Sequence, residues 1–311
     1  MKRILVTGAG GLLGGAICRR LARREDLEVI ESARAPATAG AGAIALDLSN
    51  RRAVATAIAR TRPDVVVHAA GRAQGRRHEL SIDNVLSTDN LAAALGAVSP
   101  PGAIVLLSSA AQYGRSEGRT PWRESDPCDP INDYGRSKLL AERLAYAAAA
   151  RSGLRVAALR IFNVVAHEPH GDQALSVFLR RLVAAMAAPP PRQVQMGRLT
   201  AIRDFVALED VVEAVERVID RDAWGQPINC CTGVGRPVGA LLDSVARSLA
   251  SESPGVVEIA ESGPPPELDW SVGDPALCQA KLGFTPSADL CTLIAAAAAW
   301  VRQTAKARAD A

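Results

Sequence analysis

Short, nearly continuous apolar runs alternate with segments of helical periodicity along the first half of the chain. Continuous hydrophobicity of this kind is typical of parallel strands that are buried on both faces. Six such runs occupy residues 3–6, 27–33, 43–46, 64–70, 103–107 and 155–162. Because strands that alternate with helices form a parallel sheet covered on both sides, the pattern predicts an α/β fold built on a doubly wound parallel sheet.

Helical periodicity is clearest in residues 84–95, 133–150, 174–187, 208–220 and 295–311. The regular alternation ends near residue 163, and a run of three prolines with shorter segments follows. We therefore predict a larger domain over residues 1–165 and a smaller α/β substrate lobe over residues 166–311. The lobe contains a short strand at 203–206, and the chain returns to the first domain around 201–220.

Charge and cysteine usage disfavour several function classes. The 36 basic and 33 acidic residues nearly balance, and no long basic block predicts a nucleic-acid partner. The six cysteines include no Cys-x-x-Cys pair, which favours reduced thiols in a cytoplasmic protein. The longest apolar run, residues 293–300, is too short to cross a bilayer, and the chain opens on a strand rather than a secretory leader. We expect no membrane partner.

A glycine-rich turn lies between the first strand and the first helix. This is the context that a dinucleotide-binding loop requires, since glycines allow a sharp turn, close approach of a pyrophosphate and tight helix–strand packing. The helix N-terminus adds unpaired N–H groups and a positive dipole end. The predicted phosphate loop comprises Gly8, Gly10, Gly11, Leu12, Leu13 and Gly14. Residues 1–165 are therefore predicted to form a Rossmann dinucleotide-binding domain.

The end of the second strand bears on the choice between NAD and NADP. An acidic residue at this place binds the ribose 2′-hydroxyl of NAD, whereas an arginine accommodates the 2′-phosphate of NADP. Here the strand ends at Ala33, flanked by Ser32 and Arg34. NADP is the favoured cofactor, and NAD is the alternative.

Residues at the ends of later strands complete the predicted cofactor site. Asp47 and Leu48 close the third strand, where we expect contact with the adenine edge. Small residues after the fourth strand leave room for the cofactor backbone, namely Ala69, Ala70 and Gly71. His68, at the end of the same strand, is interpreted as a structural histidine.

Tyr134 and Lys138 are four residues apart in a predicted helix, so their side chains lie on one face. An ammonium beside a phenol favours the phenolate and lowers the tyrosine pKa from about 10, which makes the pair a tunable acid. Ser109 ends the fifth strand, at the edge where open α/β sheets bind ligands. Tyr-x-x-x-Lys alone is a weak pattern, so its meaning depends on the phosphate loop.

Together these motifs resemble the extended short-chain dehydrogenase/reductase family, the NAD(P)-dependent nucleotide-sugar epimerases, dehydratases and reductases. The family's order and approximate spacing recur over most of the chain in Thr7-Gly8-x-x-Gly11-x-x-Gly14, Asp47-Leu48, His68-Ala69-Ala70, Asn84, Ser109 with Tyr113-Gly114, Tyr134-x-x-x-Lys138, Arg160-x-x-Asn163 and Arg203-Asp204-Phe205. Segments 196–205 and 229–233 are most similar to the GDP-4-keto-6-deoxy-mannose reductases of this family.

The resemblance implies a catalytic triad of Ser109, Tyr134 and Lys138. Tyr134 would protonate the oxygen of a substrate carbonyl as hydride arrives from the nicotinamide, and Ser109 would orient that carbonyl. Lys138 would lower the tyrosine pKa and hold the nicotinamide ribose. The resemblance also implies that Asn84 belongs to the cofactor site. Two further residues, Asn163 and Arg203, match positions that bind the diphosphate of a nucleotide sugar.

The two residues after Ser109 restrict the reaction. Sugar 4,6-dehydratases of the family carry an Asp-Glu pair there, and this chain has Ala110-Ala111, which cannot exchange a proton. Reduction of a ketone and epimerisation through a transient ketone remain. In either reaction we expect Ser109, Ala110 and Ala111 to contact the substrate. Because Ala33-Arg34 favours an exchangeable NADPH, the leading hypothesis is an NADPH-dependent ketoreductase acting on a nucleotide-linked deoxysugar. An NAD-dependent nucleotide-sugar 4-epimerase is the alternative.

One departure from the family opens further alternatives. The reductases usually supply a second arginine late in the chain, and Pro264 stands about where it would be, with Glu267 and Asp269 adding negative charge. A ketoreductase acting on a non-nucleotide secondary metabolite is one alternative. A non-catalytic NADP-binding regulatory protein is the other, and the complete triad argues against it.

Three further features concern a possible metal site, the oligomeric state and a loop near the active site. His167, His170 and Asp172 are possible zinc ligands, but Pro169 interrupts the helix that would fix their spacing, so no metal site is predicted. Family members often dimerise through two helices per subunit, here residues 81–95 and 133–150, and we expect a homodimer. The arginine-rich segment 72–78 either closes over the site or is a solvated loop.

Overall fold

The computed structural model describes residues 1–34, 42–166, 174–186, 192–250, 257–261, 268–287 and 289–309. Seven of the described strands form one sheet in the order β10-β6-β5-β4-β1-β2-β3. They span Lys2–Thr7 (β1), Leu27–Ala33 (β2), Ile44–Ala45 (β3), Val65–His68 (β4), Ala103–Ser109 (β5), Arg155–Ile161 (β6) and Pro227–Cys230 (β10). Every neighbouring pair is parallel, which confirms the predicted doubly wound α/β fold.

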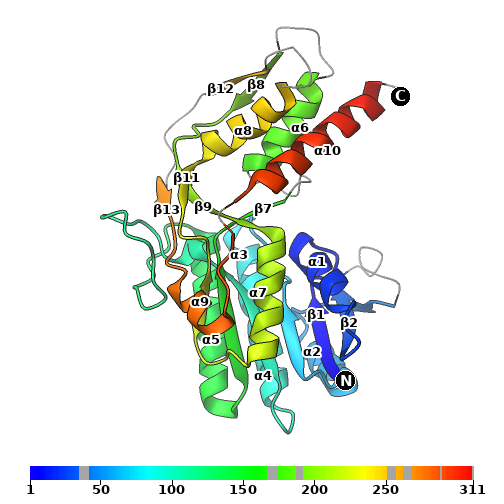
Figure 1. The fold of residues 1–311 in the computed structure, drawn as a ribbon. Coiled ribbons are helices and arrows are strands. Elements are labelled where there is room, and N and C mark those ends of the chain that lie inside the picture. The colour runs from blue at the N-terminus through cyan, green and yellow to red at the C-terminus, as the bar shows by residue number, and fades with distance from the viewer. Residues whose placement is uncertain are drawn as a thin grey trace.

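Helices cover both faces of this sheet (Figure 1). Because successive strand residues point to opposite faces, Ile4 and Val6 pack in one apolar cluster and Leu5 packs in another. The first cluster includes residues of the helices Leu12–Leu21 (α1), Leu208–Arg221 (α7) and Ala276–Leu282 (α9). The second includes residues of Arg51–Thr61 (α2), Ser87–Gly96 (α4) and Asp133–Ser152 (α5).

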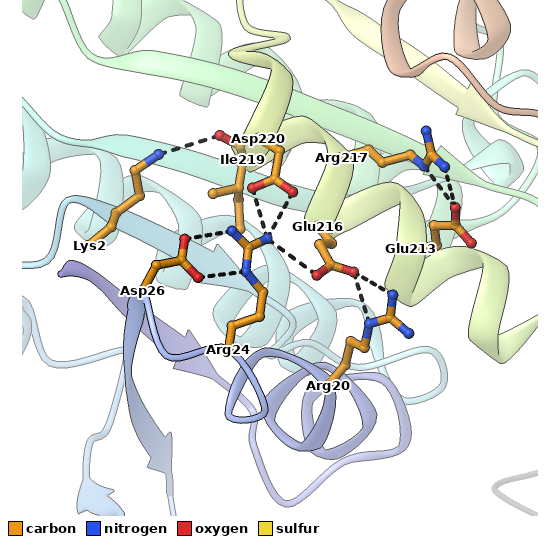
Figure 2. Close-up of polar contacts among 9 residues, drawn as sticks. All are labelled: Lys2, Arg20, Arg24, Asp26, Glu213, Glu216, Arg217, Ile219 and Asp220. Atoms are coloured by element: carbon orange, nitrogen blue, oxygen red, sulfur yellow. Dashed lines mark hydrogen bonds and ion pairs between the residues drawn. The ribbon is translucent and has the colours of Figure 1, made fainter.

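Helix α7 packs on α1 and so brings a late part of the chain back to the first strand. Arg24, just after α1, donates hydrogen bonds to Asp220 and Glu216 of α7 at 2.8 and 3.2 Å, and Arg20 donates to Glu216 at 2.9 Å (Figure 2). Surface ion pairs contribute about 0–1 kcal/mol each, so the apolar cluster between the helices supplies most of the stabilisation. The contact fixes α1, whose N-terminus follows the glycine-rich turn.

A second lobe lies beyond the sheet, at the top of Figure 1. It contains one sheet of Asn163–Val165 (β7), Ile202–Ala207 (β9), Gly235–Pro237 (β11) and Trp270–Ser271 (β13), and a pair of Arg192–Met196 (β8) and Val257–Glu261 (β12). Its helices are Ala174–Met186 (α6), Val238–Ala250 (α8) and Cys291–Ala309 (α10). These three helices share a separate apolar core that includes Phe178, Leu242 and Val301. The division of the chain at residue 165 stays a prediction.

The helix expected at residues 84–95 begins earlier than predicted. Helix α3 (Arg77–Leu80) runs into a π-helical turn, η2 (Ser81–Leu86), and then into α4. In this turn the Ser87 N–H reaches back five residues to the Ile82 carbonyl. Such wider turns occur often at functional sites. Here the turn carries Asp83 and Asn84, whose contacts are described below.

Candidate active site

The glycine-rich turn packs too tightly for side chains. A Cβ on Gly14 would overlap the Gly8 carbonyl oxygen, and a Cβ on Gly8, whose φ is +71°, would lie 2.7 Å from backbone atoms of Ala70. Gly11 is the N-cap residue of α1 and makes no side-chain cap hydrogen bond. The first N–H groups of α1 are therefore available to an anion.

A cavity of about 420 Å³ extends from this turn, and we call it the glycine-loop cavity. Nine of the predicted cofactor residues line it, namely Gly8, Gly10, Gly11, Ser32, Arg34, Leu48, Ala69, Ala70 and Gly71. Glycine and alanine walls beside a free helix N-terminus fit a long, phosphate-bearing ligand. The residues present thus fit a nicotinamide dinucleotide.

Other predicted cofactor residues have different surroundings. Leu12 opens α1, Leu13 lines a neighbouring cavity, and Gly14 packs against the glycine turn. The Asp47 carboxylate accepts hydrogen bonds from the N–H and hydroxyl of Ser49 at 3.0 and 2.8 Å. Asp47 therefore stabilises the turn that follows β3, and Leu48 is the member of that pair that lines the glycine-loop cavity.

Asn84 holds the loop after β4 in place. It is buried, accepts a hydrogen bond from the Arg72 N–H at 2.7 Å and donates to the Arg72 carbonyl at 2.9 Å. It also donates to the Ser137 hydroxyl of α5 at 2.8 Å. One side chain thus ties the wall of the glycine-loop cavity to the helix that carries Tyr134 and Lys138.

Two arginines and one aspartate form the rim of the glycine-loop cavity. The Arg34 Nη2 donates to Asp83 Oδ1 at 2.6 Å, and the Arg72 Nε donates to Asp83 Oδ2 at 2.7 Å. Burial raises the pKa of Asp83, but the hydrogen bonds from Arg72 and Arg34 outweigh it and the net shift is downward. Sequence reasoning missed Asp83, because an aspartate within a helical segment carries no signal of its own.

His68 is a structural residue, as predicted. It is buried, with Nδ1 at 2.8 Å from the Thr7 hydroxyl and Nε2 at 3.2 Å from the Thr88 hydroxyl. Burial and the nearby Lys138 charge lower its pKa to about 3. The ring therefore stays neutral at physiological pH.

Ser109, Tyr134 and Lys138 line a second cavity of about 610 Å³, which we call the Tyr134 cavity. Ser109 ends β5, and its hydroxyl accepts a hydrogen bond from the Ala111 N–H at 3.2 Å. The other two lie in the first turns of α5, which starts where the Asn132 side chain accepts a hydrogen bond from the Gly135 N–H. The two cavities share lining residues after β4.

Burial dominates the electrostatics of the triad. It raises the pKa of Tyr134, and a hydrogen bond with Ser109 partly offsets this. Burial also lowers the pKa of Lys138 to about 8, while its ammonium donates to the Leu107 carbonyl at 2.8 Å. The expectation that Lys138 lowers the tyrosine pKa was wrong, because burial determines the shift and its net direction is upward.

A buried ionic cluster joins α5 to the sheet. Arg160 of β6 pairs with Glu142 of α5 at 2.6 Å, and both side chains are less than a tenth exposed. Arg160 also donates to the Tyr113 hydroxyl at 3.0 Å, and that hydroxyl donates to Asn229 at 2.7 Å. Two motif residues of the resemblance are thus part of this cluster: Arg160 holds α5 against the sheet, and Tyr113 bonds Arg160.

The other wall of the Tyr134 cavity comes from the second lobe, with Asn163 and Arg203 among its lining residues. Asn163 donates to the Asp204 carbonyl at 3.1 Å. Arg203 donates to the carbonyls of Ile202 and Leu268 at 2.9 and 2.5 Å, and burial lowers its pKa. A desolvated guanidinium beside a cavity is a suitable anion site. Arg198, which sequence reasoning did not select, lines the same cavity.

Several sequence features lie outside the described residues. Pro264 and Glu267 are among them, as are His167, His170 and Asp172. Asp269 is described and pairs with Arg119 at 3.1 Å. Within the described ranges, no three His, Cys, Asp or Glu side chains gather as a metal site would require. In the same ranges, no helix combines the length and apolarity needed to span a membrane.

The sequence pattern of the NAD dependent epimerase/dehydratase family matches residues 4–231. This match covers the glycine-rich turn, the triad and β10. The chain belongs to that family. It is accordingly an NAD(P)-dependent oxidoreductase of the extended short-chain dehydrogenase/reductase type, as the resemblance implied.

Individual relatives agree with this assignment. The chain is 35% identical to dTDP-6-deoxy-L-talose 4-dehydrogenase (NAD(P)(+)) of Kitasatospora kifunensis over 91% of each chain. It is 28% identical to GDP-6-deoxy-D-mannose reductase of Pseudomonas aeruginosa over 59% of this chain and 62% of that one. Thermus thermophilus UDP-glucose 4-epimerase, solved in complex with NAD, superposes with a TM-score of 0.81 at 25% identity, covering 96% of this family member and 99% of the epimerase.

Proposed function

We propose that this family member is an NADPH-dependent ketoreductase that reduces the 4-ketone of a nucleotide-linked deoxysugar. The observation that carries the proposal is the position of Ser109, Tyr134 and Lys138 in one cavity that adjoins the glycine-loop cavity. A carbonyl bound there would lie beside a phenol, a hydroxyl and an ammonium.

Each member of the triad has one chemical role in the proposal. NADPH, when bound, supplies the hydride that reduces the carbonyl carbon. Tyr134 donates its phenolic proton to the carbonyl oxygen, because the alkoxide that forms needs an acid within hydrogen-bond reach. Ser109 donates a hydrogen bond to the same oxygen and orients it. Lys138 keeps a positive charge near the phenol and stabilises the phenolate left after proton transfer.

The residues that follow Ser109 support reduction rather than dehydration. Ala110 and Ala111 form a short 3₁₀ turn with Gln112, and both alanines line the Tyr134 cavity. Neither side chain can carry a proton to or from the sugar. Elimination of water needs an acid and a base on the substrate side, so the cavity suits a reaction that ends with proton transfer to oxygen.

The proposed substrate rests on the second lobe and on the relatives. Arg203 presents a partly desolvated guanidinium to the Tyr134 cavity, and arginine is well suited to phosphate oxygens. We propose that Arg203 and Asn163 hold the diphosphate. The Kitasatospora kifunensis relative is named for oxidation at position 4 of a 6-deoxysugar nucleotide, and the reverse of such an oxidation is reduction of a 4-ketone.

The decisive experiment is a turnover assay. NADPH oxidation is followed at 340 nm with dTDP-, GDP- and UDP-linked 4-keto-6-deoxysugars, and with free ketones as controls. We expect turnover only with a nucleotide-linked ketone. Equal turnover of free ketones would contradict the sugar-nucleotide assignment, and no turnover of any ketone with either NADPH or NADH would contradict the ketoreductase.

A nucleotide-sugar 4-epimerase is the second candidate, favoured by one observation. Arg34 is paired with Asp83, so it is not a free cation for a 2′-phosphate. An epimerase recycles its NAD, and it would purify with tightly bound NAD and interconvert 4-epimers without added cofactor. Detection of both properties, in the absence of NADPH turnover, would replace the leading proposal.

We also propose that two copies associate through η2 and α5, which pack against each other. Large apolar side chains are exposed on both elements, namely Ile82 and Leu86 on η2 and Leu140 on α5, each at least 40% exposed. A second copy would cover them. Light scattering after size exclusion should give a molar mass twice that of one chain. The double variant Leu86→Glu, Leu140→Glu should give the mass of a single chain. A monomeric unsubstituted protein would refute the dimer.

A further inference from the structure

Three charged side chains, Arg34, Arg72 and Asp83, form the rim of the glycine-loop cavity. Arg34 follows the last residue of β2, where the ribose of a dinucleotide is expected. Its partner Asp83 comes from η2, and the second partner of Asp83, Arg72, comes from the loop after β4. One carboxylate thus holds two guanidinium groups from separate segments of the chain.

The three side chains differ in their access to solvent. Arg34 is 66% exposed, Arg72 is 38% exposed and Asp83 is only 12% exposed. Arg34 can therefore turn toward a ligand at little cost in packing, whereas Asp83 is fixed between its partners. The Asn84 side chain, which bonds both the N–H and carbonyl of Arg72, fixes the backbone on the other side.

We propose that Asp83 is a specificity-determining residue that moderates the preference for NADP(H) and lets the protein also accept NAD(H). In the absence of a 2′-phosphate, Asp83 satisfies both arginines, so a plain ribose leaves Arg34 and Arg72 paired. A 2′-phosphate must draw Arg34 away from Asp83 before it gains an ion pair. The carboxylate therefore acts as a competing anion within the protein.

This inference rests on the proposed function only in placing a nicotinamide dinucleotide in the glycine-loop cavity. It can be tested by binding alone. Isothermal titration of NADP⁺ and of NAD⁺ into the full-length protein, without substrate, measures both dissociation constants. Absence of ketone turnover would leave this test intact, and an unchanged cofactor ratio would leave the ketoreductase proposal intact.

The principal variant is Asp83→Asn, which keeps the side-chain shape and frees both arginines. We expect NADP⁺ to bind about tenfold more tightly, because an ion pair no longer has to break, while NAD⁺ binding changes less than about twofold. The matched control is Asp89→Asn, which removes the same charge further along the same helical stretch. It should leave the ratio of the two constants unchanged, which separates a local effect from one of net charge.

The Arg34→Gln variant distinguishes two effects of Asp83: holding Arg34 away from the 2′-phosphate, and repelling the phosphate directly. In that background, Asp83→Asn should lose most of its effect on NADP⁺, because Arg34, the arginine next to the expected ribose position, is no longer there to be released from the carboxylate to the phosphate. An equal gain in both backgrounds would mean that Asp83 repels the phosphate directly, which would overturn the proposal. So would an unchanged or weaker affinity of Asp83→Asn for NADP⁺. The NAD⁺ titration serves as the check that each variant is folded.

Discussion

The glycine-loop cavity and the Tyr134 cavity use charge in opposite ways. At the rim of the glycine-loop cavity, the solvent-accessible side chains of Arg34 and Arg72 pair with the largely buried Asp83. In the Tyr134 cavity, where we propose that catalysis occurs, Tyr134 and Lys138 are buried, and desolvation shifts both pKa values. Solvent and salt screen the charges at the rim, whereas the buried charge of Lys138 is screened little. Substitutions should therefore have large effects on turnover in the Tyr134 cavity and small effects on binding at the rim.

The largest effect is expected from Tyr134→Phe. Loss of a positioned proton donor should lower kcat by about 10³-fold, with little change in the dissociation constant of NADP⁺. Tyr146→Phe is a matched control on the same helix, since its hydroxyl lies away from both cavities and accepts a hydrogen bond from the Ala158 N–H. It should cost some stability and leave kcat nearly unchanged. Full activity of Tyr134→Phe would exclude the phenol as the acid.

A smaller loss is expected from Ser109→Ala. Removing one donor to the developing oxyanion should lower kcat by about 10²-fold. Ser109→Thr retains the hydroxyl and should recover most of that loss. Because we propose that Ser109 and Tyr134 act on one oxygen, the double variant should be little worse than Tyr134→Phe alone. Multiplied losses in steady-state kinetics would mean that the two residues act independently.

The pH profile should reveal which buried group limits activity at high pH. Lys138, with its pKa lowered to about 8, loses its charge above that pH, whereas Tyr134, with its pKa raised, stays protonated beyond its ordinary range. Activity should therefore fall by about tenfold per unit above pH 8, assigned to the lysine. In Lys138→Arg the charge persists, and any remaining activity should not fall there. A wild-type profile flat to pH 10 would refute this assignment.

The smallest effect is expected at the rim. Arg34→Gln should weaken NADP⁺ by about three- to tenfold and leave NAD⁺ unchanged, because an exposed ion pair is worth little. Raising the salt concentration should shrink this difference, while the kcat loss of Tyr134→Phe should not depend on salt. A loss of NADP⁺ binding comparable to the catalytic losses would show that the rim is not screened as its exposure implies.

Sequence reasoning succeeded where one element contains its own signal. The continuous apolar runs of β1, β4, β5 and β6 and the glycine-rich turn are local patterns, so the sheet could be predicted with errors of a few residues at strand ends. The helix α2 was not predicted, although its buried residues Val54, Ala57 and Ile58 recur at helical spacing. Strand β3 is shorter than predicted, since only two residues pair with the end of β2.

The candidate site was predictable only in part. Tyr134, Lys138 and Ser109 were chosen from motifs, and the structure brings them into one cavity. Asp83 and Glu142 could not be chosen, because their importance depends on arginines of other elements, 11, 18 and 49 residues away, that no local pattern pairs with them. The tyrosine pKa was predicted from its nearest charge, whereas burial decides its direction.

The packing of α7 on α1 has a consequence for biosynthesis. A ribosome delivers Arg24 early, but its partner Asp220 is 196 residues away and emerges much later. Until then the nascent sheet exposes Ile17 and Leu21 of α1 and an edge of β6 that β10 will eventually pair. Such exposed faces and edges favour aggregation. A gene fragment that stopped at residue 165 would therefore yield a poorly soluble product. A holding chaperone would bind the nascent chain during the period before α7 and β10 are synthesised.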